Sequence, residues 1–544
     1  MVRKAPSWLE KAVFYQIYPQ SFYDSNADGI GDIPGIIEKL SYLETLGVTG
    51  VWLNPCFVSP FQDAGYDVAD YYKVAPRYGT NDDLKHLFAA AKERGIRILL
   101  DLVPGHTSVE HAWFKESQKQ PPNPYTDTYI WNNSIWDMPQ DDLQVVRGYG
   151  ERDGGYVTNF FWFQPALNYG FAQTDPNHPW MQPVNAPGPQ RVREEIKKIM
   201  AFWLDMGASG FRVDMADSLV KRDPHKQETA KFWGWIRDCM ADSYPEAVLV
   251  SEWGSPEKAI SAGFHIDFML GFNNPGWVSL FRKRGVGRWR DPYSWSFFDE
   301  SGHGDIQQFL DEYLPYLDRT KGKGYISLIT GNHDETPRLA NGRSDRMMKL
   351  IYLFLLTMPG TPFIYYGDEI GMKSRDLPSK EGGYTRTGAR TPMQWSDEEN
   401  AGFSHATSDM LYLPVSDDPN RPTVAEQDKD PESILNRVRA LIRIRRLYKA
   451  LDADADFEVV YAESGKLPLV YKRVKEEQKL IIALNPSAQP VRVNLSGGVI
   501  KDLPKIIDAP GDVKIIKEDT GWNLQLGPVS GGIFKISRIS ENQM

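Results

Sequence analysis

Four short polar clusters in the chain each follow a strand-like run of apolar residues. The clusters are DLVPGH, GFRVD, VLVSEW and GNHD, at residues 101–106, 210–214, 248–253 and 331–334. Since each apolar run ends where the polar residues begin, we expect the clusters at the carboxyl ends of barrel strands, where such barrels carry their active sites. Cleavage of an acetal between two sugars needs an acid for the leaving oxygen and a carboxylate for the developing oxocarbenium ion. The clusters contain carboxylates for both tasks.

Asp214 and Glu252 are the candidate pair for this chemistry. Arg212 precedes Asp214 by two residues on the same strand face, and its permanent charge is expected to keep that carboxylate ionised, as a nucleophile requires. Glu252 follows three apolar residues and precedes Trp253, and these surroundings favour the protonated form that a general acid needs. Either carboxylate alone could equally be a strand-end salt-bridge partner. It is the set of clusters that favours catalysis.

The composition indicates a globular protein with more than one domain. The chain has 544 residues, of which 41% are hydrophobic and 12% aromatic, enough for a large core. A formal net charge of -10 argues against a nucleic-acid partner, because duplex binding requires clustered Lys and Arg. The one basic run, residues 437–449, carries a helical apolar stripe and is interpreted as a core helix with a solvated face.

Cysteine usage and hydropathy bear on the compartment. The only cysteines, Cys56 and Cys239, lie far apart, so neither a disulfide framework nor a zinc site is expected. The amino terminus lacks an apolar leader, and no uninterrupted apolar run reaches the roughly 20 residues that a membrane span needs. We therefore predict a cytoplasmic protein with no membrane partner.

Strand-like and helix-like segments alternate along the first part of the chain. Strands are expected at 13–17, 50–53 and 96–102, and helices at 33–46 and 81–94. The second helix carries its own start signal, because Thr80 can cap the backbone amide of Asp83. Segments in this order form right-handed βαβ units.

The alternation predicts an α/β fold, a (β/α)8 TIM barrel formed by residues 1–106 and 190–452. Residues 107–189 interrupt it with aromatic, Pro-rich and Asn-rich sequence that is too long for an ordinary loop, which indicates an inserted subdomain after the third strand. The pattern resumes with a helix at 190–206. Residues 453–544 alternate between short apolar runs and Gly, Pro or Asn turns, and predict a C-terminal antiparallel β-sandwich.

Through these motifs the chain resembles the α-amylase family, glycoside hydrolase family 13, over nearly its whole length. The resemblance implies that Asp214 of GFRVD is the nucleophile, that Glu252 is the acid/base, and that Asp334 of NHD stabilises the transition state. It also implies retention of anomeric configuration through a covalent glucosyl-enzyme intermediate. Three further positions match residues that bind the reacting glucose in this family, namely Arg212, His106 and His333.

The segment QDAGYD resembles the exo-acting branch of the same family. There the Asp, here Asp63, grips the terminal glucose together with the Arg of ARTPMQW, here Arg390, and closes the pocket behind it. Tyr66 of the same segment offers a ring face for stacking. The alternative interpretation of Asp63 is a purely structural salt bridge.

The loop DSNADGIGD is a candidate metal site. Oxygen ligands stand at its positions one, three, five, seven and nine, which are Asp24, Asn26, Asp28, Ile30 and Asp32. Position twelve is Gly35, where a full EF-hand loop has a bidentate Glu. The exo-acting relatives that the chain resembles bind calcium or magnesium in this loop, so we predict a structural Ca²⁺ or Mg²⁺ ion and no organic cofactor. An Asx-turn loop of similar sequence is the alternative.

Three positions depart from the family pattern. Gly105 stands where most relatives have Asn, and residues 164–168 read QPALN where exo-acting glucosidases have QPDLN. Both changes remove oxygen ligands, so the second calcium site of amylases, between barrel and inserted domain, is expected to be absent. Met215, after the nucleophile, matches neither residue common in that branch, which leaves linkage preference open.

The predicted function is a retaining exo-acting α-glucosidase or transglucosylase on short α-glucosides. An isomerase resembling trehalose synthase, or one acting on sucrose, is an alternative, because residues 389–404 and 411–415 resemble that group. A third alternative is a catalytically inactive partner subunit like the transporter heavy chains that share the barrel. The intact carboxylates at 214, 252 and 334 oppose it. Hydrolysis, transfer and isomerisation remain open as outcomes of one reaction class.

Overall fold

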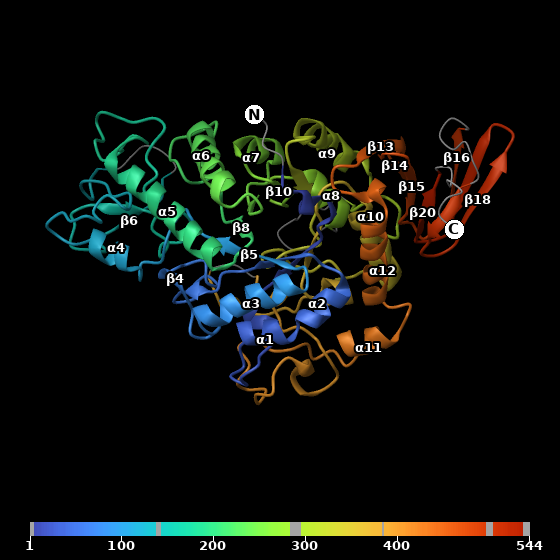
Figure 1. Ribbon diagram of the computed structural model, residues 1–544, viewed down its shortest axis with the longest axis horizontal. Helices are drawn as coiled ribbons and strands as arrows, with labels where there is room; N and C mark the ends of the chain where they lie inside the picture. The colour runs from blue at the N-terminus through green and yellow to red at the C-terminus, as the bar shows by residue number, and fades with distance from the viewer. Residues whose placement is uncertain (1–4, 138–142, 283–294, 383–385, 497–503, 537–544) are drawn as a thin grey trace.

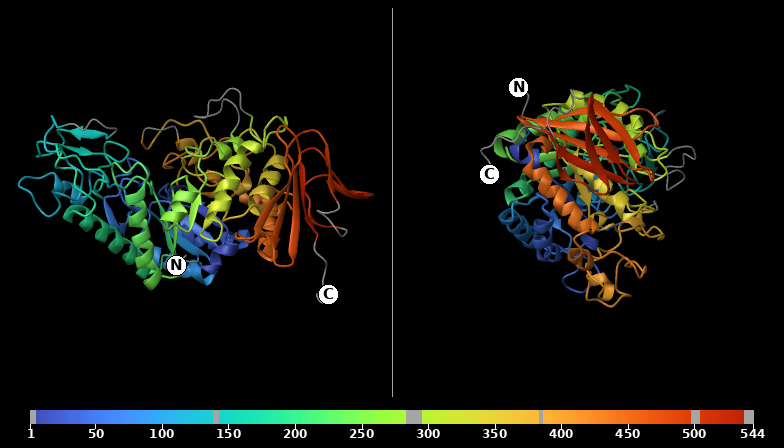
Figure 2. Two further views of the ribbon diagram at one scale, coloured as in Figure 1. Left: turned by 90° about the horizontal axis from the view of Figure 1, so that it is seen from above. Right: turned by 90° about the vertical axis from the view of Figure 1, so that its right-hand side faces the viewer.

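The computed structural model describes residues 5–137, 143–282, 295–382, 386–496 and 504–536. Along the longest axis of the molecule, the segment between β5 and α5 lies at one end and the C-terminal strands lie at the other, with the barrel between them (Figure 1, Figure 2). Within the described ranges no helix combines the length and the apolar character that a membrane crossing requires.

The centre of the molecule is one sheet of eight parallel strands, which confirms the predicted TIM barrel. In sequence order they are β1 (Phe14–Ile17), β2 (Gly50–Leu53), β5 (Arg97–Leu102), β8 (Gly210–Val213), β9 (Val248–Ser251), β10 (Ile266–Phe268), β11 (Tyr325–Ser327) and β12 (Phe363–Tyr365). From β1 to β11 each strand pairs with the next barrel strand in sequence, and β1 also pairs with β12. A parallel bridge from Ile329 to Phe363 joins the last two strands and closes the ring.

Helices surround the barrel strands (Figure 1). They are α1 (Ile33–Glu38), α2 (Leu40–Leu46), α3 (Asn81–Glu93), α5 (Pro187–Met206), α6 (Gln227–Ser243), α7 (Pro256–Ala262), α8 (Pro275–Phe281), α9 (Gln307–Thr320), α10 (Asp345–Thr357), α11 (Val424–Lys429) and α12 (Ile434–Leu447). The capping box at Thr80 and Asp83 forms as predicted. The helix expected at 33–46 is instead two helices, broken at Lys39, whose ammonium packs 3.8 Å from the ring centre of Tyr23. Helix α5 begins three residues before the predicted Gln190, because Pro187 is favourable in a first helical turn.

The segment between β5 and α5 has its own small core. It contains α4 (Ala112–Ser117) and the antiparallel pair β6 (Val145–Arg147) and β7 (Gly155–Val157). Its apolar cluster consists of Ile130, Val157, Ala166, Phe171, Trp180 and Met181. An antiparallel bridge from Ala166 to His106 and a hydrogen bond from the Tyr169 hydroxyl to the Pro104 carbonyl, 2.8 Å long, attach this core to the end of β5. A second short pair, β3 (Phe57–Val58) and β4 (Asp70–Val74), follows β2.

Two antiparallel sheets form the C-terminal region, as predicted. One has the order β13-β14-β15-β20-β17 and the other β16-β19-β18. The strands are β13 (Asp456–Tyr461), β14 (Leu469–Lys475), β15 (Gln478–Asn485), β16 (Val491–Ser496), β17 (Lys505–Asp508), β18 (Val513–Glu518), β19 (Gly521–Leu526) and β20 (Ser530–Lys535). Alternate residues of β19, including Trp522 and Leu524, enter the apolar layer between the sheets.

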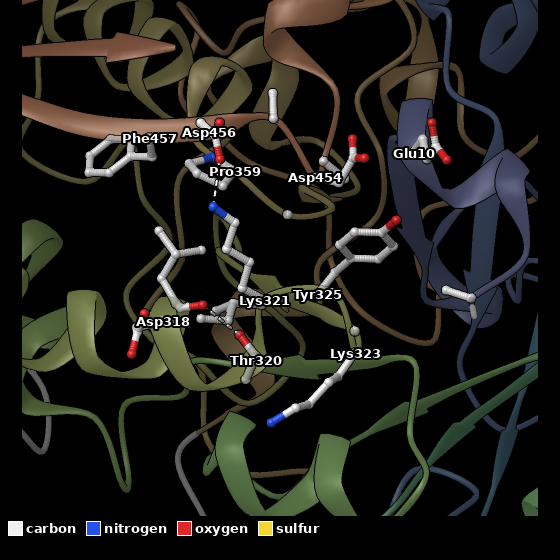
Figure 3. A pocket seen from close by; sticks show the side chains of 18 of the residues that line it. Glu10, Asp318, Thr320, Lys321, Lys323, Tyr325, Pro359, Asp454, Asp456 and Phe457 are labelled. Carbon is white, nitrogen blue, oxygen red and sulfur yellow. Dashed lines mark hydrogen bonds and ion pairs between the residues drawn. The ribbon is translucent and has the colours of Figure 1, made fainter. Parts of the chain in front are cut away.

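A cavity of about 420 Å³ lies where the amino ends of the barrel strands meet the C-terminal region (Figure 3). Beside it, the carboxylates of Glu10, Asp452 and Asp454 lie within 4.8 Å of one another. The Lys475 ammonium is 3.1, 2.9 and 2.5 Å from these three carboxylates. Because Lys475 lies on β14 and Glu10 precedes β1, these contacts tie the C-terminal sheet to the barrel.

Candidate active site

The predicted catalytic carboxylates meet at the carboxyl end of the barrel. Asp214 and Glu252 each follow the last residue of a strand, β8 and β9, and Asp334 lies in the loop after β11. All three line one cavity of about 470 Å³, together with Asp63 and Tyr66. His106 also lines this cavity, whereas Arg212, His333 and Arg390 are buried behind its wall.

Arg212 is the buried cation at the centre of the site. Its guanidinium is 3.0 Å from Asp214 Oδ1, 2.6 Å from Glu252 Oε1 and 2.9 Å from Asp101 Oδ1. Asp101, on β5, also accepts hydrogen bonds from the Trp52 indole and the Tyr66 hydroxyl, both 2.9 Å long. One cation therefore fixes both catalytic carboxylates, and Asp101 in turn holds that cation in place.

The ionisation of Asp214 differs from the sequence-based expectation. Burial and the negative charge of Glu252 raise the pKa of Asp214 well above its usual range, although the Arg212 charge acts in the opposite direction. Burial is the larger of the two causes, because it penalises the charged form of a carboxyl. The nucleophilic role predicted for Asp214 requires its ionised form, which the Arg212 charge favours.

Asp267 holds the loop that carries Glu252. Its Oδ1 accepts hydrogen bonds from the Ser251 hydroxyl at 2.6 Å and the Trp253 amide at 3.1 Å, and its Oδ2 accepts one from the Ser255 amide at 2.9 Å. Burial raises the pKa of Asp267 to about 7. The sequence analysis missed this residue, because nothing in the sequence shows that β10 places it beside β9.

Asp334 is held by two arginines. Arg386 Nη1 is 2.7 Å and Arg390 Nη2 is 2.9 Å from Asp334 Oδ1. Burial raises the pKa of Asp334, but the positive charges around it, Arg386 foremost, outweigh burial and hold that pKa well below its usual range. Asp334 is therefore an anion at any working pH, as a group that stabilises positive charge must be.

The arginine partner of Asp63 is not the one expected from the sequence. Asp63 Oδ1 is 2.7 Å from Arg386 Nη2, and its Oδ2 accepts a 2.9 Å hydrogen bond from Gln164. Arg390 instead lies deeper, with hydrogen bonds to the His333 carbonyl at 2.8 Å and to Glu381 at 3.0 Å. The short 3-10 turn between the two arginines places Arg386, not Arg390, at the cavity surface. The sequence TRTGAR contains both, four residues apart, but does not show which of them faces the pocket.

The two histidines of the motifs are both uncharged. Burial lowers the pKa of His106 to about 3 and that of His333 well below its usual range. His333 stacks on Tyr66, with ring centres 5.2 Å apart and an angle of 7° between the planes. Its Nδ1 lies 3.1 Å from the Gln16 amide. Tyr66 is thus fixed between His333 and Asp101 as part of the pocket wall.

The candidate metal loop is folded around its own side-chain oxygens. Asp24 accepts hydrogen bonds from the backbone amides of Ala27 and Gly29, each 2.8 Å long. Asp28 accepts one from the amide of Ile30 at 2.9 Å. The Asn26 side chain accepts a hydrogen bond from the amide of Asp28 at 3.0 Å. Asp32 caps α1 by accepting a hydrogen bond from the amide of Gly35. Across the described residues, only Glu10, Asp452 and Asp454 bring three acidic or His/Cys ligand atoms within 4.8 Å. The loop thus has a suitable donor set, but a bound ion would have to draw its carboxylates together.

Two aromatic side chains stand at the mouth of the cavity. Phe160 comes from the inserted segment and is 42% exposed, and Phe272 follows β10 and is 51% exposed. Both side chains line the cavity, so a ligand that entered it would contact their rings. Flat ring faces at the mouth suit the apolar face of a sugar ring.

Comparison with known proteins places this geometry in a family. The model of the alpha amylase catalytic domain matches residues 16–454. A trehalose synthase/amylase of Mycolicibacterium smegmatis is 34% identical, covering 86% of this chain and 81% of the relative. An oligo-1,6-glucosidase of Parageobacillus thermoglucosidasius is 31% identical, covering 97% of this chain and 99% of the relative.

A solved structure agrees with these matches. An isomaltulose synthase of Erwinia rhapontici NX5, in complex with D-glucose, superposes with a TM-score of 0.79 at 25% identity, covering 98% of this chain and 100% of that one. The matched range includes the barrel except for the first two residues of β1, and every predicted catalytic carboxylate described above. The chain therefore belongs to the alpha-amylase family, glycoside hydrolase family 13.

Proposed function

We propose that the protein is a retaining, exo-acting α-glucosidase or transglucosylase on short α-glucosides. The observation that carries this proposal is the bridge from Asp63 through Arg386 to Asp334, with contacts of 2.7 Å on either side. Because this bridge closes the cavity beside the Asp214 and Glu252 pair, a terminal glucose can enter but a long chain cannot pass through. The relatives described above are, by name, a trehalose synthase/amylase and an oligo-1,6-glucosidase.

The geometry supports a double displacement. Asp214 attacks the anomeric carbon while Glu252 gives its proton to the leaving oxygen, so the glycosidic bond breaks and a glucosyl ester forms on Asp214. Glu252, now a carboxylate, then takes a proton from water or from a sugar hydroxyl, whose oxygen attacks the same carbon and releases Asp214. Two inversions give net retention. Arg212 and Asp334 supply fixed charges of opposite sign around the reacting carbon.

Isomerisation is the second candidate, and a specific observation favours it. The matches include a trehalose synthase/amylase and isomaltulose synthases as well as glucosidases. All of these outcomes share one intermediate and differ in whether water or the retained sugar attacks it. In this chain Phe160, Phe272 and Met215 surround the position that a released sugar would occupy.

Product analysis tests the proposal. The enzyme is incubated separately with maltose, isomaltose, sucrose and trehalose, and glucose is resolved from new disaccharides and longer sugars. Glucose alone indicates a hydrolase, an isomeric disaccharide indicates an isomerase, and longer sugars indicate transfer. The Asp214→Asn variant, which keeps the side-chain shape, is the control. No turnover of any α-glucoside by the parent, or full activity of this variant, would refute the proposal.

We further infer that the Asp24–Asp32 loop binds a structural Ca²⁺ or Mg²⁺ ion. The donor set of carboxylate, amide and carbonyl oxygens suits hard cations. Since an ion that binds only the folded state stabilises it, chelation should lower the melting temperature, and added Ca²⁺ or Mg²⁺ should restore it. An Asp28→Ala variant should melt at the lower temperature with or without chelator. A melting temperature that chelation leaves unchanged would contradict the inference.

We also propose a cytoplasmic location. Both cysteines, Cys56 and Cys239, are free, and unpaired thiols persist in reducing compartments. Fractionation of the producing cells, with the protein followed by antibody, tests this assignment.

A further inference from the structure

Gly105 faces a space that another side chain fills. A Cβ atom at this position would lie 2.6 Å from Asn159 Nδ2, closer than such atoms can approach, and 3.3 Å from Ser218 Oγ, which is tight. The backbone angle does not require glycine, because Gly105 is outside the left-handed region. The size of residue 105, in the loop after β5, therefore limits where the Asn159 side chain of the inserted segment can lie.

The positions of the carbonyl oxygen and the NH₂ group of the Asn159 side chain are fixed by their partners. The Lys221 ammonium is 2.7 Å from Asn159 Oδ1, and since an ammonium only donates hydrogen bonds, that atom must be the carbonyl oxygen. Lys221 is itself fixed by the Ser218 carbonyl at 2.8 Å. The NH₂ group of Asn159 must then face the opposite side, where it is 3.1 Å from Ser218 Oγ and 3.2 Å from His106 Nδ1.

This amide is one of two partners that place the proton of His106 on Nε2. Because Nδ1 accepts from Asn159, the single proton of the neutral ring must be on Nε2. Nε2 lies 3.1 Å from the carbonyl oxygen of Tyr66, which can only accept. Both ring nitrogens thus have partners of the correct kind, and the ring that lines the cavity is locked in one orientation. The same NH₂ group lies 3.9 Å from the sulfur of Met215, a second residue of the cavity wall.

We propose that Asn159 is a positioning residue for glucosyl transfer, which holds the orientation of the His106 ring through Nδ1, and that Gly105 is required to leave room for it. The proposal rests on the proposed function for its kinetic part only. Asn159 does not line the cavity, so its effect on substrate passes through His106 and Met215. The charge on Lys221 keeps the amide from turning over, because a turned amide would place its NH₂ group against the ammonium.

Variants at three positions test the proposal. Asn159→Ala should raise KM and lower kcat/KM by about 10²-fold, the loss typical of a misplaced active-site group. Asn168→Ala is the control, because Asn168 is a buried amide of the same segment whose side chain hydrogen-bonds to the Asp127 carbonyl, the Gln182 side chain and the Gly170 amide. It should lower the melting temperature as Asn159→Ala does but leave KM unchanged. A KM of the Asn159→Ala enzyme equal to that of the parent would overturn the proposal.

A rescue variant separates positioning from general damage. Gly105→Ala alone should lower kcat/KM, because the added Cβ displaces the Asn159 amide. In the Asn159→Ala background the same change should lower kcat/KM no further. Gly105→Asn combined with Asn159→Gly supplies an amide from the opposite wall and should recover at least about a tenth of the parental kcat/KM. The proposal would be refuted if the effects of Gly105→Ala and Asn159→Ala on kcat/KM were additive. It would also be refuted if the Gly105→Asn, Asn159→Gly enzyme had a kcat/KM no higher than that of Asn159→Ala.

A spectroscopic readout keeps this test independent of the proposed function. In protein labelled with ¹⁵N-histidine, the His106 signals, assigned by loss in His106→Gln, should show a neutral ring protonated on Nε2. In Asn159→Ala the Tyr66 carbonyl should keep the proton on Nε2, but the Nδ1 signal should shift because its hydrogen bond is lost. An Nδ1-protonated ring in the parent would overturn the proposal even if α-glucosides are turned over, and the expected spectra would support it even if none of the four disaccharides is.

Discussion

At the scale of single residues, the site depends on buried charges that share partners. Arg212 is shared by Asp214, Glu252 and Asp101, and Asp334 is shared by Arg386 and Arg390. A buried charge that loses one of several partners keeps the others, so each substitution should alter chemistry more than folding. The arginine pair at Asp334 provides a direct comparison.

Arg386→Lys should damage the pocket without unfolding the protein. A lysine has one ammonium in place of the planar fork and cannot bridge Asp63 and Asp334 at 2.7 Å on both sides. We expect kcat/KM to fall by about 10²-fold, mainly through KM, because the closed end of the pocket opens. Steady-state kinetics on the best disaccharide, with a thermal melt, measures both effects. Arg319→Lys, at an exposed pair with Glu257, is the control and should change neither quantity. Equal kcat/KM for the Arg386→Lys enzyme and the parent would contradict this role.

At the scale of secondary-structure elements, the site depends on strand register. Strands β9 and β10 pair Ser251 with Asp267, which places that carboxylate under the loop carrying Glu252. The sequence predicted both strand ends that bear catalytic groups, because apolar runs that stop at polar residues are a local signal. Asp267 and Asn159 were missed because their roles depend on which elements become neighbours. The break at Lys39 and the choice between Arg386 and Arg390 likewise depend on tertiary packing.

Asp267→Asn should loosen the Glu252 loop and change the pH dependence of stability. The amide cannot accept all the hydrogen bonds that the carboxylate accepts, so kcat should fall while KM changes little. Since burial raises the Asp267 pKa to about 7, the folded parent binds a proton that the unfolded chain has released above its lower carboxyl pKa. The parent therefore loses stability as pH rises towards about 7, and the variant should lack this loss.

Denaturant unfolding at several pH values measures the effect. The unfolding free energy of the parent minus that of Asp267→Asn should decrease from about pH 4 to about pH 7 and be constant above it. The exposed Asn133→Ala change, which alters no titratable group, should give a difference that does not vary with pH. A parent-minus-variant difference that rises with pH would contradict the assigned cause.

At the scale of the whole molecule, the cavity is built jointly by the barrel and the inserted segment. Phe272 follows barrel strand β10, whereas Phe160 comes from the segment between β5 and α5, and both stand exposed at the mouth. The C-terminal sheets lie at the far end of the molecule (Figure 2). They are tied to the barrel by Lys475 and by Arg473, whose guanidinium donates to the Asp452 carbonyl at 2.7 Å. Reaction outcome should therefore depend on the mouth and not on the C-terminal region.

Phe160→Ala and Phe272→Ala should change the product ratio more than the rate. Removing either ring opens the mouth to water and removes a face against which a released sugar can stay, so more of the glucosyl intermediate should be hydrolysed. The ratio of free glucose to transferred or isomerised glucose should rise about severalfold, while consumption of substrate falls less than about tenfold, because neither ring contacts the reacting carbon. Product quantification from the best disaccharide gives both numbers. Trp136→Ala, an exposed aromatic of the same segment that does not line the cavity, should leave the ratio unchanged. If the two phenylalanine variants keep the parental ratio, the acceptor is held elsewhere, and the mouth only admits substrate.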